Sequence, residues 1–355
     1  MSDQDVSAPR KLLVSGRRLL IFSGLFALLT LLGFYAVYDQ FAGQKLVFDP
    51  QLLAWTTLLS IGGLFILYIL SDGLRLYFTL RALGQKVPLG QIFRLVFINI
   101  FFSNVTPMAT GGGVAQIWYL QRHGVRMGTA TAATTIRTVL AVIFIFSLTP
   151  IFLLTLEVLH NQALISRISG VLAVLIVLYL GFFAIVLFRS RWLIGPVSRT
   201  LRILRRLHLI SEERYVRWQY RCRREMLRFS SSFAIYLQGP KLHILLSVFF
   251  TFLFLISLFS FPALIIAGLG YHVDYLVTTG LLVVTTFVMY FSPTPGAAGV
   301  SEGLFGSFFS GILTPDHLIL VILIWRLVTV YIGMLIGLVI MQVEIAPGKK
   351  AREKT

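Results

Sequence analysis

The sequence has one cysteine and few charged residues, and both shortages exclude whole classes of protein. Cys222 stands alone, which excludes an internal disulfide and any cysteine metal cluster. Charged residues make up 13% of the 355 residues, about half of the roughly 25% that is usual in soluble domains. Acidic residues are the scarcer kind, with 14 Asp and Glu against 31 Lys and Arg. A soluble globular protein is therefore not expected.

Motifs of known enzyme classes are also missing. The chain has no nucleotide-binding P-loop, no H-E-x-x-H zinc motif and no G-x-S-x-G nucleophile elbow. Its six histidines are scattered along the chain, mostly at expected membrane edges or loops. We therefore predict no catalytic residue, no metal site and no cofactor.

Apolar residues, in contrast, are abundant at 57% of the chain. Several runs exceed 18 apolar residues, which predicts transmembrane helices and an all-α polytopic membrane protein. Six full spans are expected, at about 19–38, 52–71, 138–157, 165–188, 242–269 and 317–341. Two further apolar segments, 91–123 and 274–313, are broken by proline and glycine. The first span is longer than a signal-peptide core and has no clear cleavage site, so we expect it to stay uncleaved.

The net charge of +17 is explained by the positive-inside rule for membrane proteins rather than by nucleic-acid binding. Lys and Arg gather in clusters between the spans, and the largest cluster places 13 of them in residues 189–241. If all the basic regions are cytoplasmic, both termini are cytoplasmic too. Parity then requires the first broken segment to enter and leave from the cytoplasmic side, and the second from the outer side. Each is predicted to be a re-entrant hairpin.

The resulting layout has five parts. They are a basic cytoplasmic N-terminus (1–18), a first membrane half (19–188), a basic cytoplasmic loop (189–241), a second membrane half (242–342) and a basic cytoplasmic tail (343–355). In the loop, arginines alternate with apolar and aromatic residues, as in amphipathic helices that lie on an anionic leaflet. Docking of a partner protein is the alternative role for this loop.

The two broken segments resemble each other. "TPMATGGGVAQ" at 106–116 is similar to "TPGAAGVSE" at 294–302, and an arginine follows the proline by 30 residues in one copy and 31 in the other. An internal repeat with three spans and one hairpin per copy would be inverted in its second half, as in many transporters. The alternative is two unrelated broken helices.

Glycines at the breaks suggest a binding site. Gly111–Gly113 should lead into a helix from about Val114 to His123, and Gly299 into one from Val300 to about Gly311. A helix N-terminus favours phosphate or carboxylate, and glycine lets a ligand approach the backbone closely. Tight helix packing, which small residues also permit, is the alternative.

Charged residues in the hydrocarbon are costly and usually face a cavity or a partner. Arg137 and Arg326 occupy equivalent repeat positions, and guanidinium groups hold phosphate well. The alternative for Arg137 is snorkelling to the membrane edge. Glu302 could neutralise an arginine, bind a lipid amine or carry a proton, and a structural ion pair with Arg326 is its ordinary interpretation. Asp72 and Arg75 are expected to form a local pair.

These considerations give a set of predicted substrate-binding residues, which share polar groups, backbone breaks or buried charge. They are Asn104, Thr106, Pro107, Gly111, Gly112, Gly113, Gln116, Arg137, Pro295, Gly296, Gly299, Ser301, Glu302 and Arg326. Asn99 and Thr110 are expected to line the same cavity.

The same residues carry a family resemblance. Pro107 with the Gly111–Gly113 run, then Pro295 and Gly296 with a Gly-Val-x-Glu ending, then Trp325-Arg326-Leu327 resemble the bacterial flippase-like family, also called the lysylphosphatidylglycerol synthetase transmembrane region. The resemblance covers roughly residues 15–342. The chain departs from many relatives at Gln116, Trp118 and Ile136, which affects the identity of the substrate. The longer relatives add a soluble aminoacyl-transferase domain, which is not found in this sequence.

The resemblance implies an integral membrane lipid translocase or lipid-binding transporter in the bacterial inner membrane. Its substrate would be an anionic or aminoacylated phospholipid or a polyprenyl-phosphate lipid, and its partners are membrane phospholipids rather than nucleic acid. The alternative is a non-transporting scaffold for a lipid synthase or glycosyltransferase, docked through 189–241. A membrane-embedded transferase is a weaker alternative, because the sequence offers no pair of nucleophile and base.

Overall fold

The computed structural model describes residues 49–156 and 234–345, together with a few single positions outside these ranges. Within the described residues every regular element is a helix, which confirms the all-α class. The predicted spans at 19–38 and 165–188, and most of the basic loop 189–241, lie outside the described residues. The described helices include both broken segments.

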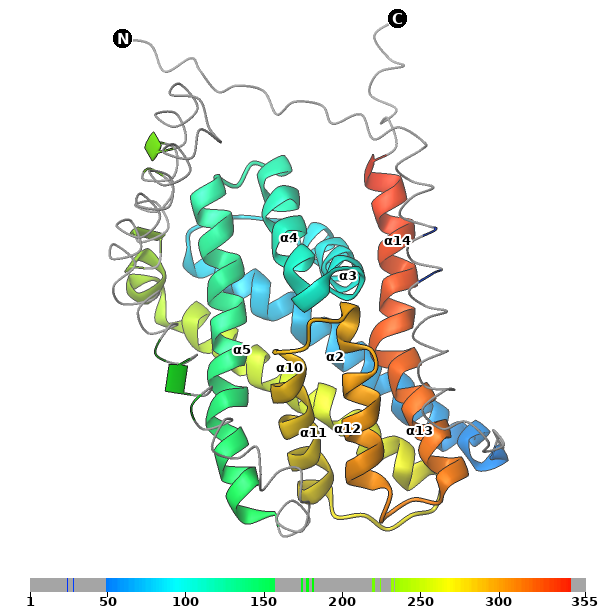
Figure 1. Cartoon of the computed structure of the whole chain (residues 1–355). Coiled ribbons are helices and arrows are strands. Elements are labelled where there is room, and N and C mark those ends of the chain that lie inside the picture. The colour runs from blue at the N-terminus through cyan, green and yellow to red at the C-terminus, as the bar shows by residue number, and fades with distance from the viewer. Residues whose placement is uncertain are drawn as a thin grey trace, which may run out of the picture.

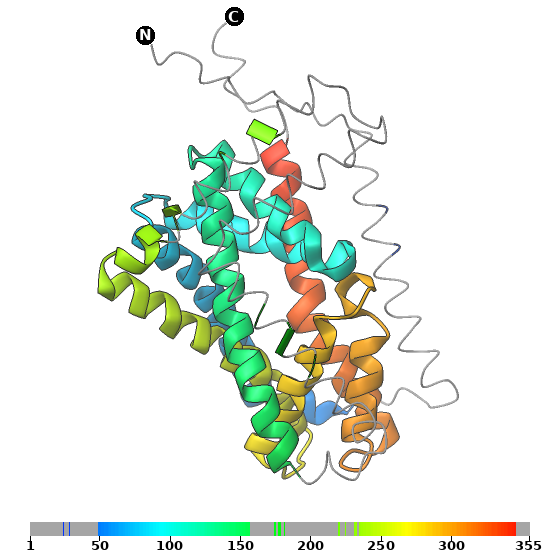
Figure 2. The same cartoon turned by 60° about the vertical axis from the view of Figure 1, so that its left-hand side comes forward.

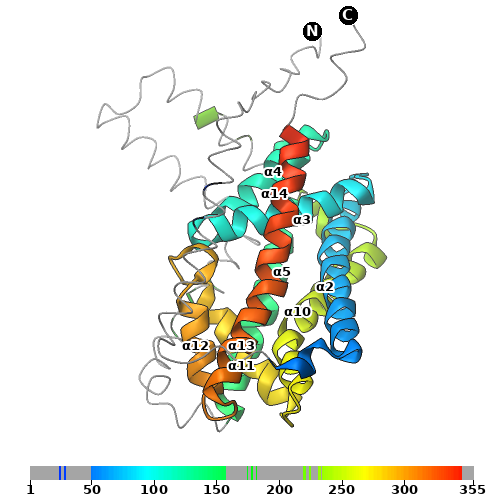
Figure 3. The same cartoon turned by 90° about the vertical axis from the view of Figure 1, so that its right-hand side faces the viewer.

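Four long apolar helices run between the two ends of the molecule (Figures 1 and 3). They are α2 (Trp55–Ala82), α5 (Met127–Thr155), α10 (Lys241–Gly268), and α13 (Pro315–Arg326) continued through the π-helical turn η5 (Leu327–Tyr331) into α14 (Ile332–Ile345). Each is long and apolar enough to cross a membrane, because 28 residues at about 1.5 Å each exceed a hydrocarbon core of about 30 Å. They match the predicted spans at 52–71, 138–157, 242–269 and 317–341.

Two predicted span boundaries are wrong. Helix α2 continues past residue 71 to Ala82, and α5 begins at Met127 rather than at 138. Hydropathy falls in both places, at Asp72 and Arg75 in α2 and in the alanine- and threonine-rich start of α5. These residues are largely buried against other helices, so the helix does not need an apolar surface toward lipid there.

Both broken segments are helix–turn–helix units, as predicted. The first is α3 (Leu89–Val105), the turn η2 (Pro107–Ala109) and α4 (Thr110–Arg122). The second is α11 (Tyr275–Met289), the turn η4 (Pro295–Ala297) and α12 (Val300–Phe309). In each unit the two helices pack against each other as a hairpin. The predicted start of α12 at Val300 is confirmed.

The start of α4 differs from the prediction. The helix begins at Thr110, not at Val114, so all three glycines lie in its first turn. Glycine is a poor helix former, but here the amide of Gly111 is held by the side chain of Thr106 in the turn, with an N–Oγ1 distance of 2.8 Å. The glycines therefore start the helix rather than precede it.

The two hairpins open toward opposite ends of the molecule, and their tips touch in the middle. In Figure 1 the α3–α4 hairpin lies toward the end where α5 begins and α14 finishes, whereas α11 and α12 lie toward the other end. The tip turn η4 packs against both η2 and α3. Helix α5 runs the length of the molecule beside both hairpins, as Figure 2 also shows.

The tips share an unusual backbone. In η2, Met108 and Ala109 both have φ of 52°, and in η4, Gly296 and Ala297 have φ of 58° and 55°. Positive φ is uncommon for residues other than glycine, yet it occurs at the same two places after a proline in both segments. This agreement supports the internal repeat over two unrelated breaks.

Helix α14 packs closely on α3 through two glycines. A Cβ atom on Gly337 would overlap the carbonyl oxygen of Phe97, and one on Gly333 would lie 2.9 Å from Ile100. Backbone approach of this kind is typical of small residues at membrane helix interfaces. It fixes the first hairpin against the last helix.

We predict that Gly337→Ala destabilises the protein, because the added methyl must push α14 away from the backbone of α3. Overpacking of this kind costs about 1–3 kcal/mol, which thermal unfolding in detergent would register as a lower Tm. The matched control is Gly62→Ala on α2, where no atom of the described residues lies within 4 Å of the added Cβ. Equal Tm values for the two variants would contradict the close packing.

Candidate functional site

Glu302 and Arg326 form a buried ion pair in the second half. Arg326 Nε donates to Glu302 Oε1 at 2.6 Å, and Arg326 and Glu302 are almost inaccessible, at 4% and 1% exposed. Arg326 Nη2 also donates to the carbonyl oxygen of Gly296 at 3.1 Å and to the hydroxyl of Ser301. The guanidinium at the end of α13 therefore holds the hairpin tip and the start of α12 together.

The other oxygen of Glu302 closes the N-terminus of its own helix. Glu302 Oε2 accepts from the amide of Gly299 at 2.7 Å and from the hydroxyl of Ser301 at 2.8 Å. Since every partner of the carboxylate is a donor, the geometry suits an ionised acid. Of the interpretations left open by the sequence, the ion pair with Arg326 is the one observed.

The first half contains a second buried cluster, built around Asp72. Its Oδ1 atom accepts from Arg75 Nε at 2.7 Å and from Arg137 Nη2 at 2.5 Å. Asp72, Arg75 and Arg137 are 2%, 7% and 4% exposed. Arg75 also stacks on the ring of Phe254, with its guanidinium carbon 3.7 Å from the ring centre, a cation–π contact. The cluster joins α2, α5 and α10.

The structure bears on one expectation and one alternative for these residues. The local pair of Asp72 and Arg75 is confirmed, but it is shared with a third residue 65 positions away. Snorkelling of Arg137 is wrong, because its side chain is buried and bound to Asp72. Asp72 and Arg75 were not among the predicted site residues. The signal that points to them is a pair of opposite charges three residues apart inside an otherwise apolar helix.

Arg137 keeps one donor without a partner. Its Nε atom is buried and makes no hydrogen bond to any described residue. A buried N–H of a charged group is costly to leave unpaired. This atom is therefore a natural place for an incoming acceptor.

The three glycines at the start of α4 differ in how closely other residues pack against them. A Cβ on Gly111 would lie 3.0 Å from the Phe102 carbonyl oxygen, and one on Gly112 would overlap the Ser103 hydroxyl, so both are close to α3. Gly113 differs, since among the described residues its added Cβ would meet only Thr134, at 3.9 Å. Tight packing thus accounts for the first two glycines, while the third leaves room beside α5.

Polar side chains of the first hairpin bond mainly to one another or to the backbone. The side-chain amide of Gln116 donates to Asn99 Oδ1, and the Gln116 oxygen is buried without a hydrogen-bond donor among the described residues. Asn104 donates to the carbonyl of Ile100 at 2.8 Å and lies against Gly296 of the opposite tip. Gln116 and Glu302 therefore occupy matching places in the two copies but have different partners.

The structure does not bring all the predicted residues into one site. Arg326, Glu302, Ser301, Gly296 and Gly299 are joined in one hydrogen-bonded network, whereas Arg137 belongs to the Asp72 cluster. The two arginines hold different acids. Binding of a head-group phosphate by Arg137 or Arg326 stays a prediction.

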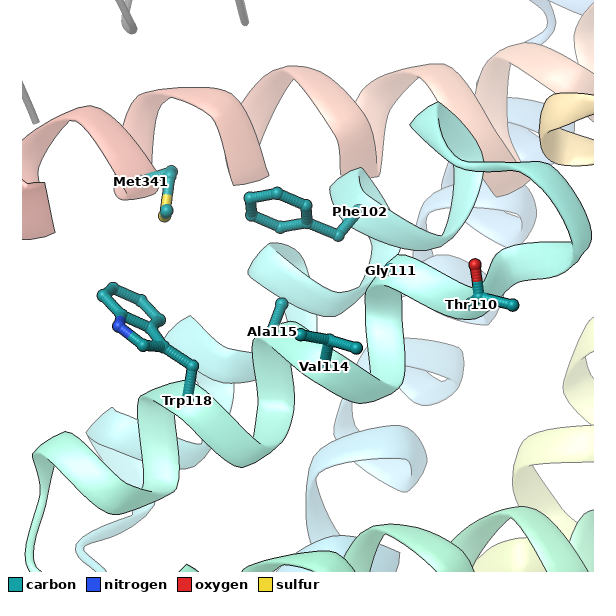
Figure 4. A pocket seen from close by; sticks show the side chains of 7 residues that line it. All are labelled: Phe102, Thr110, Gly111, Val114, Ala115, Trp118 and Met341. Atoms are coloured by element: carbon teal, nitrogen blue, oxygen red, sulfur yellow. The ribbon is translucent and has the colours of Figure 1, made fainter. Parts of the chain in front are cut away.

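An apolar groove runs along α4. It has a volume of about 340 Å³ and is lined by Phe102, Thr110, Gly111, Val114, Ala115, Trp118 and Met341. Figure 4 shows Thr110 at one end of the groove and Trp118 with Met341 at the other. The lining comes from α3, α4 and α14 and is almost entirely apolar. Its apolar lining suits a hydrocarbon chain.

A second groove of about 570 Å³ lies between α2 and α10, near the start of α11. Its lining is also mostly apolar, with two serines and Tyr275 as the polar members: Ser60, Gly63, Leu64, Leu67, Ser260, Ala263, Leu264, Ala267, Val273 and Tyr275. None of its lining residues belongs to the glycine run or to either ion-paired cluster.

Sequence comparison assigns the chain to a family. A profile described as the lysylphosphatidylglycerol synthase TM region matches residues 11–337. The chain belongs to this family. A UPF0104 membrane protein of Archaeoglobus fulgidus is 21% identical over 283 residues, covering 80% of this chain and 85% of the relative. The resemblance inferred from the Pro, Gly and Trp-Arg-Leu motifs is thereby confirmed, and the chain is a multi-pass membrane protein of the lysylphosphatidylglycerol synthase TM-region family.

We predict that Glu302→Ala is strongly destabilising, because it leaves Arg326 charged and buried without its acid. Removing one partner of a buried pair costs about 3–5 kcal/mol. The double variant Glu302→Ala with Arg326→Met should recover part of this loss, as measured by Tm in detergent. If the double variant is less stable than the single one, the pair is not the main role of Glu302.

Proposed function

We propose that this chain is a flippase-like lipid translocase or lipid-binding transporter of the cell membrane. The observation that carries the proposal is the contact between the tips of two hairpins that open toward opposite ends of the molecule. Broken backbone is tolerated at membrane depth only where protein buries it or where it lines a cavity. Breaks of this kind form the substrate sites of many transporters, midway between the two sides.

Charge supports an orientation. The helix ends on the side of the first hairpin carry Arg81, Arg122, Arg126 and Lys241, whereas the loops on the other side carry Asp49, Asp274 and Asp316. By the positive-inside rule the first of these ends is cytoplasmic. In this proposal both broken segments are re-entrant, six helices span the bacterial inner membrane, and both termini are cytoplasmic.

The substrate class follows from the buried arginines and from the groove. A lipid head group with a phosphate would be held by guanidinium groups near the start of α4, and the groove along α4 would receive an acyl or prenyl chain. Candidates are an anionic or aminoacylated phospholipid or a polyprenyl-phosphate lipid. The name of the family refers to lysylphosphatidylglycerol, a lipid of this kind.

Movement would consist of rocking one half against the other about the hairpin tips, so that the site faces each side of the membrane in turn. In this proposal the tips must part for a head group to pass. A covalent link between the tips should therefore prevent transport.

We predict that a disulfide between Asn104→Cys and Gly296→Cys blocks translocation. A Cβ built on Gly296 lies 3.7 Å from the Cβ of Asn104, close to the mean Cβ separation of about 3.8 Å in disulfides. With Cys222 replaced by serine, the double variant in liposomes should move a fluorescent anionic phospholipid only after reduction with dithiothreitol. Wild-type protein should exceed empty liposomes under both conditions.

Each single cysteine variant is the matched control and should be indifferent to the redox state. Transport that continues at the same rate in the fully cross-linked protein would contradict rocking about the tips. Wild-type protein that moves no anionic lipid faster than empty liposomes do would contradict the translocase proposal itself.

A further inference from the structure

Buried charges in the membrane interior of this chain do not balance. Among the described residues, three arginines are at most 7% exposed, namely Arg75, Arg137 and Arg326, against two such acids, Asp72 and Glu302. Of the two expected spans outside the described residues, 19–38 contains no charged residue and 165–188 contains one, Arg167, which is a further cation and not an acid. Among the described residues, the buried charges therefore leave one positive charge in excess.

The excess lies in the first half. Glu302 and Arg326 are paired one to one, and both carboxylate oxygens are occupied by donors. Asp72 instead serves two guanidinium groups through the same oxygen, while Arg137 Nε has no partner among the described residues. An unmatched charge in a low-dielectric interior is expensive. The cluster therefore favours binding of an anion.

The start of α4 faces α5 within one helical turn of Arg137. Thr134 precedes Arg137 by three residues on α5, about 4.5 Å along the helix axis. Apart from its own helix, a Cβ built on Gly113 would meet only the methyl group of Thr134 among the described residues, at 3.9 Å. The space beside Gly113 is therefore on the side of α5 that lies next to the turn carrying Arg137.

We propose that Arg75 and Arg137, sharing Asp72, form the head-group site for a lipid that carries one phosphodiester charge and no amine, which rests on the translocase function proposed above. A single negative charge neutralises the excess. A phosphomonoester, with a second charge near neutral pH, would overcompensate it. An aminoacylated head group would place an ammonium beside two arginines, and both buried acids are already ion-paired.

The test measures lipid binding to the full chain in nanodiscs of neutral phosphatidylcholine. Displacement of a fluorescent phosphatidylglycerol is followed with phosphatidylglycerol, lysylphosphatidylglycerol, a polyprenyl phosphate and the water-soluble glycerophosphoglycerol. Phosphatidylglycerol should displace the probe best. Equal displacement by glycerophosphoglycerol would overturn a lipid site, and stronger displacement by either of the other lipids would overturn the charge argument.

Variants test the charge count directly. Arg137→Gln should weaken phosphatidylglycerol binding about tenfold or more, because a charged hydrogen-bond donor is lost, and Gly113→Leu should weaken it by filling the space between α4 and α5 next to Thr134. Asp72→Asn raises the excess to two charges and should shift the preference toward the polyprenyl phosphate. Arg94→Gln is the matched control, since Arg94 pairs with Glu344 at the surface with its side chain 58% exposed.

The Tm of each variant shows whether it is folded. If Arg137→Gln is unstable, Arg137→Lys replaces it in the test, because lysine keeps the charge. Arg137→Lys should keep the preference for phosphatidylglycerol with reduced affinity. An unchanged preference in both Asp72→Asn and Arg137→Gln would overturn this site. Translocation of all lipids without selectivity would overturn the head-group site but not the translocase proposal. Selective binding without translocation would overturn the translocase proposal but not the head-group site.

Discussion

Inside a membrane, backbone amides and carbonyls that leave a helix need other hydrogen-bond partners, and this requirement determines the structure at the centre of the protein. Where the chain leaves its helices at the two tips, side chains from the same hairpin or the next helix take over. Thr106 holds the amide of Gly111, Glu302 holds the amide of Gly299, and Arg326 holds the carbonyl of Gly296. The two tips then rest on each other, while Met108 and Ala109 of the first tip stay exposed.

The two halves pair their buried charged and polar groups in different ways. In the second half, one acid and one base satisfy each other, and the network around them has no spare acceptor on Glu302. In the first half, Gln116 stands in the acid's place and bonds to Asn99, while Arg137 reaches across to Asp72. This leaves the Gln116 oxygen and Arg137 Nε unpaired among the described residues. The charged groups of the second half thus pair one to one, whereas the first half has two guanidinium groups on one carboxylate.

Part of the fold can be predicted from the sequence because proline and glycine occur close together in both broken segments, whereas the single prolines Pro150 and Pro262 leave α5 and α10 continuous. The breaks at Pro107 and Pro295, and the start of α12, follow from that local signal. The ends of α2 and α5 do not, since a hydropathy run stops at Asp72 although packing carries the helix on to Ala82. The pairing of Asp72 with Arg137 could not be predicted either. It joins residues 65 positions apart, and a helix that is apolar on most sides has no periodicity to show which face meets which.

The π-helical turn after Arg326 allows one span to contact both hairpins. Arg326 must face Glu302 in the second hairpin, while Gly333 and Gly337 must face α3 in the first. A π-turn inserts an extra residue into the helical repeat and so rotates the helix after the turn relative to the helix before it. Because η5 (Leu327–Tyr331) stands between these two sets, it lets a single span hold one hairpin with its charged face and the other with its small-residue face. Helix α13 together with α14 is therefore the element that ties both halves of the repeat to each other.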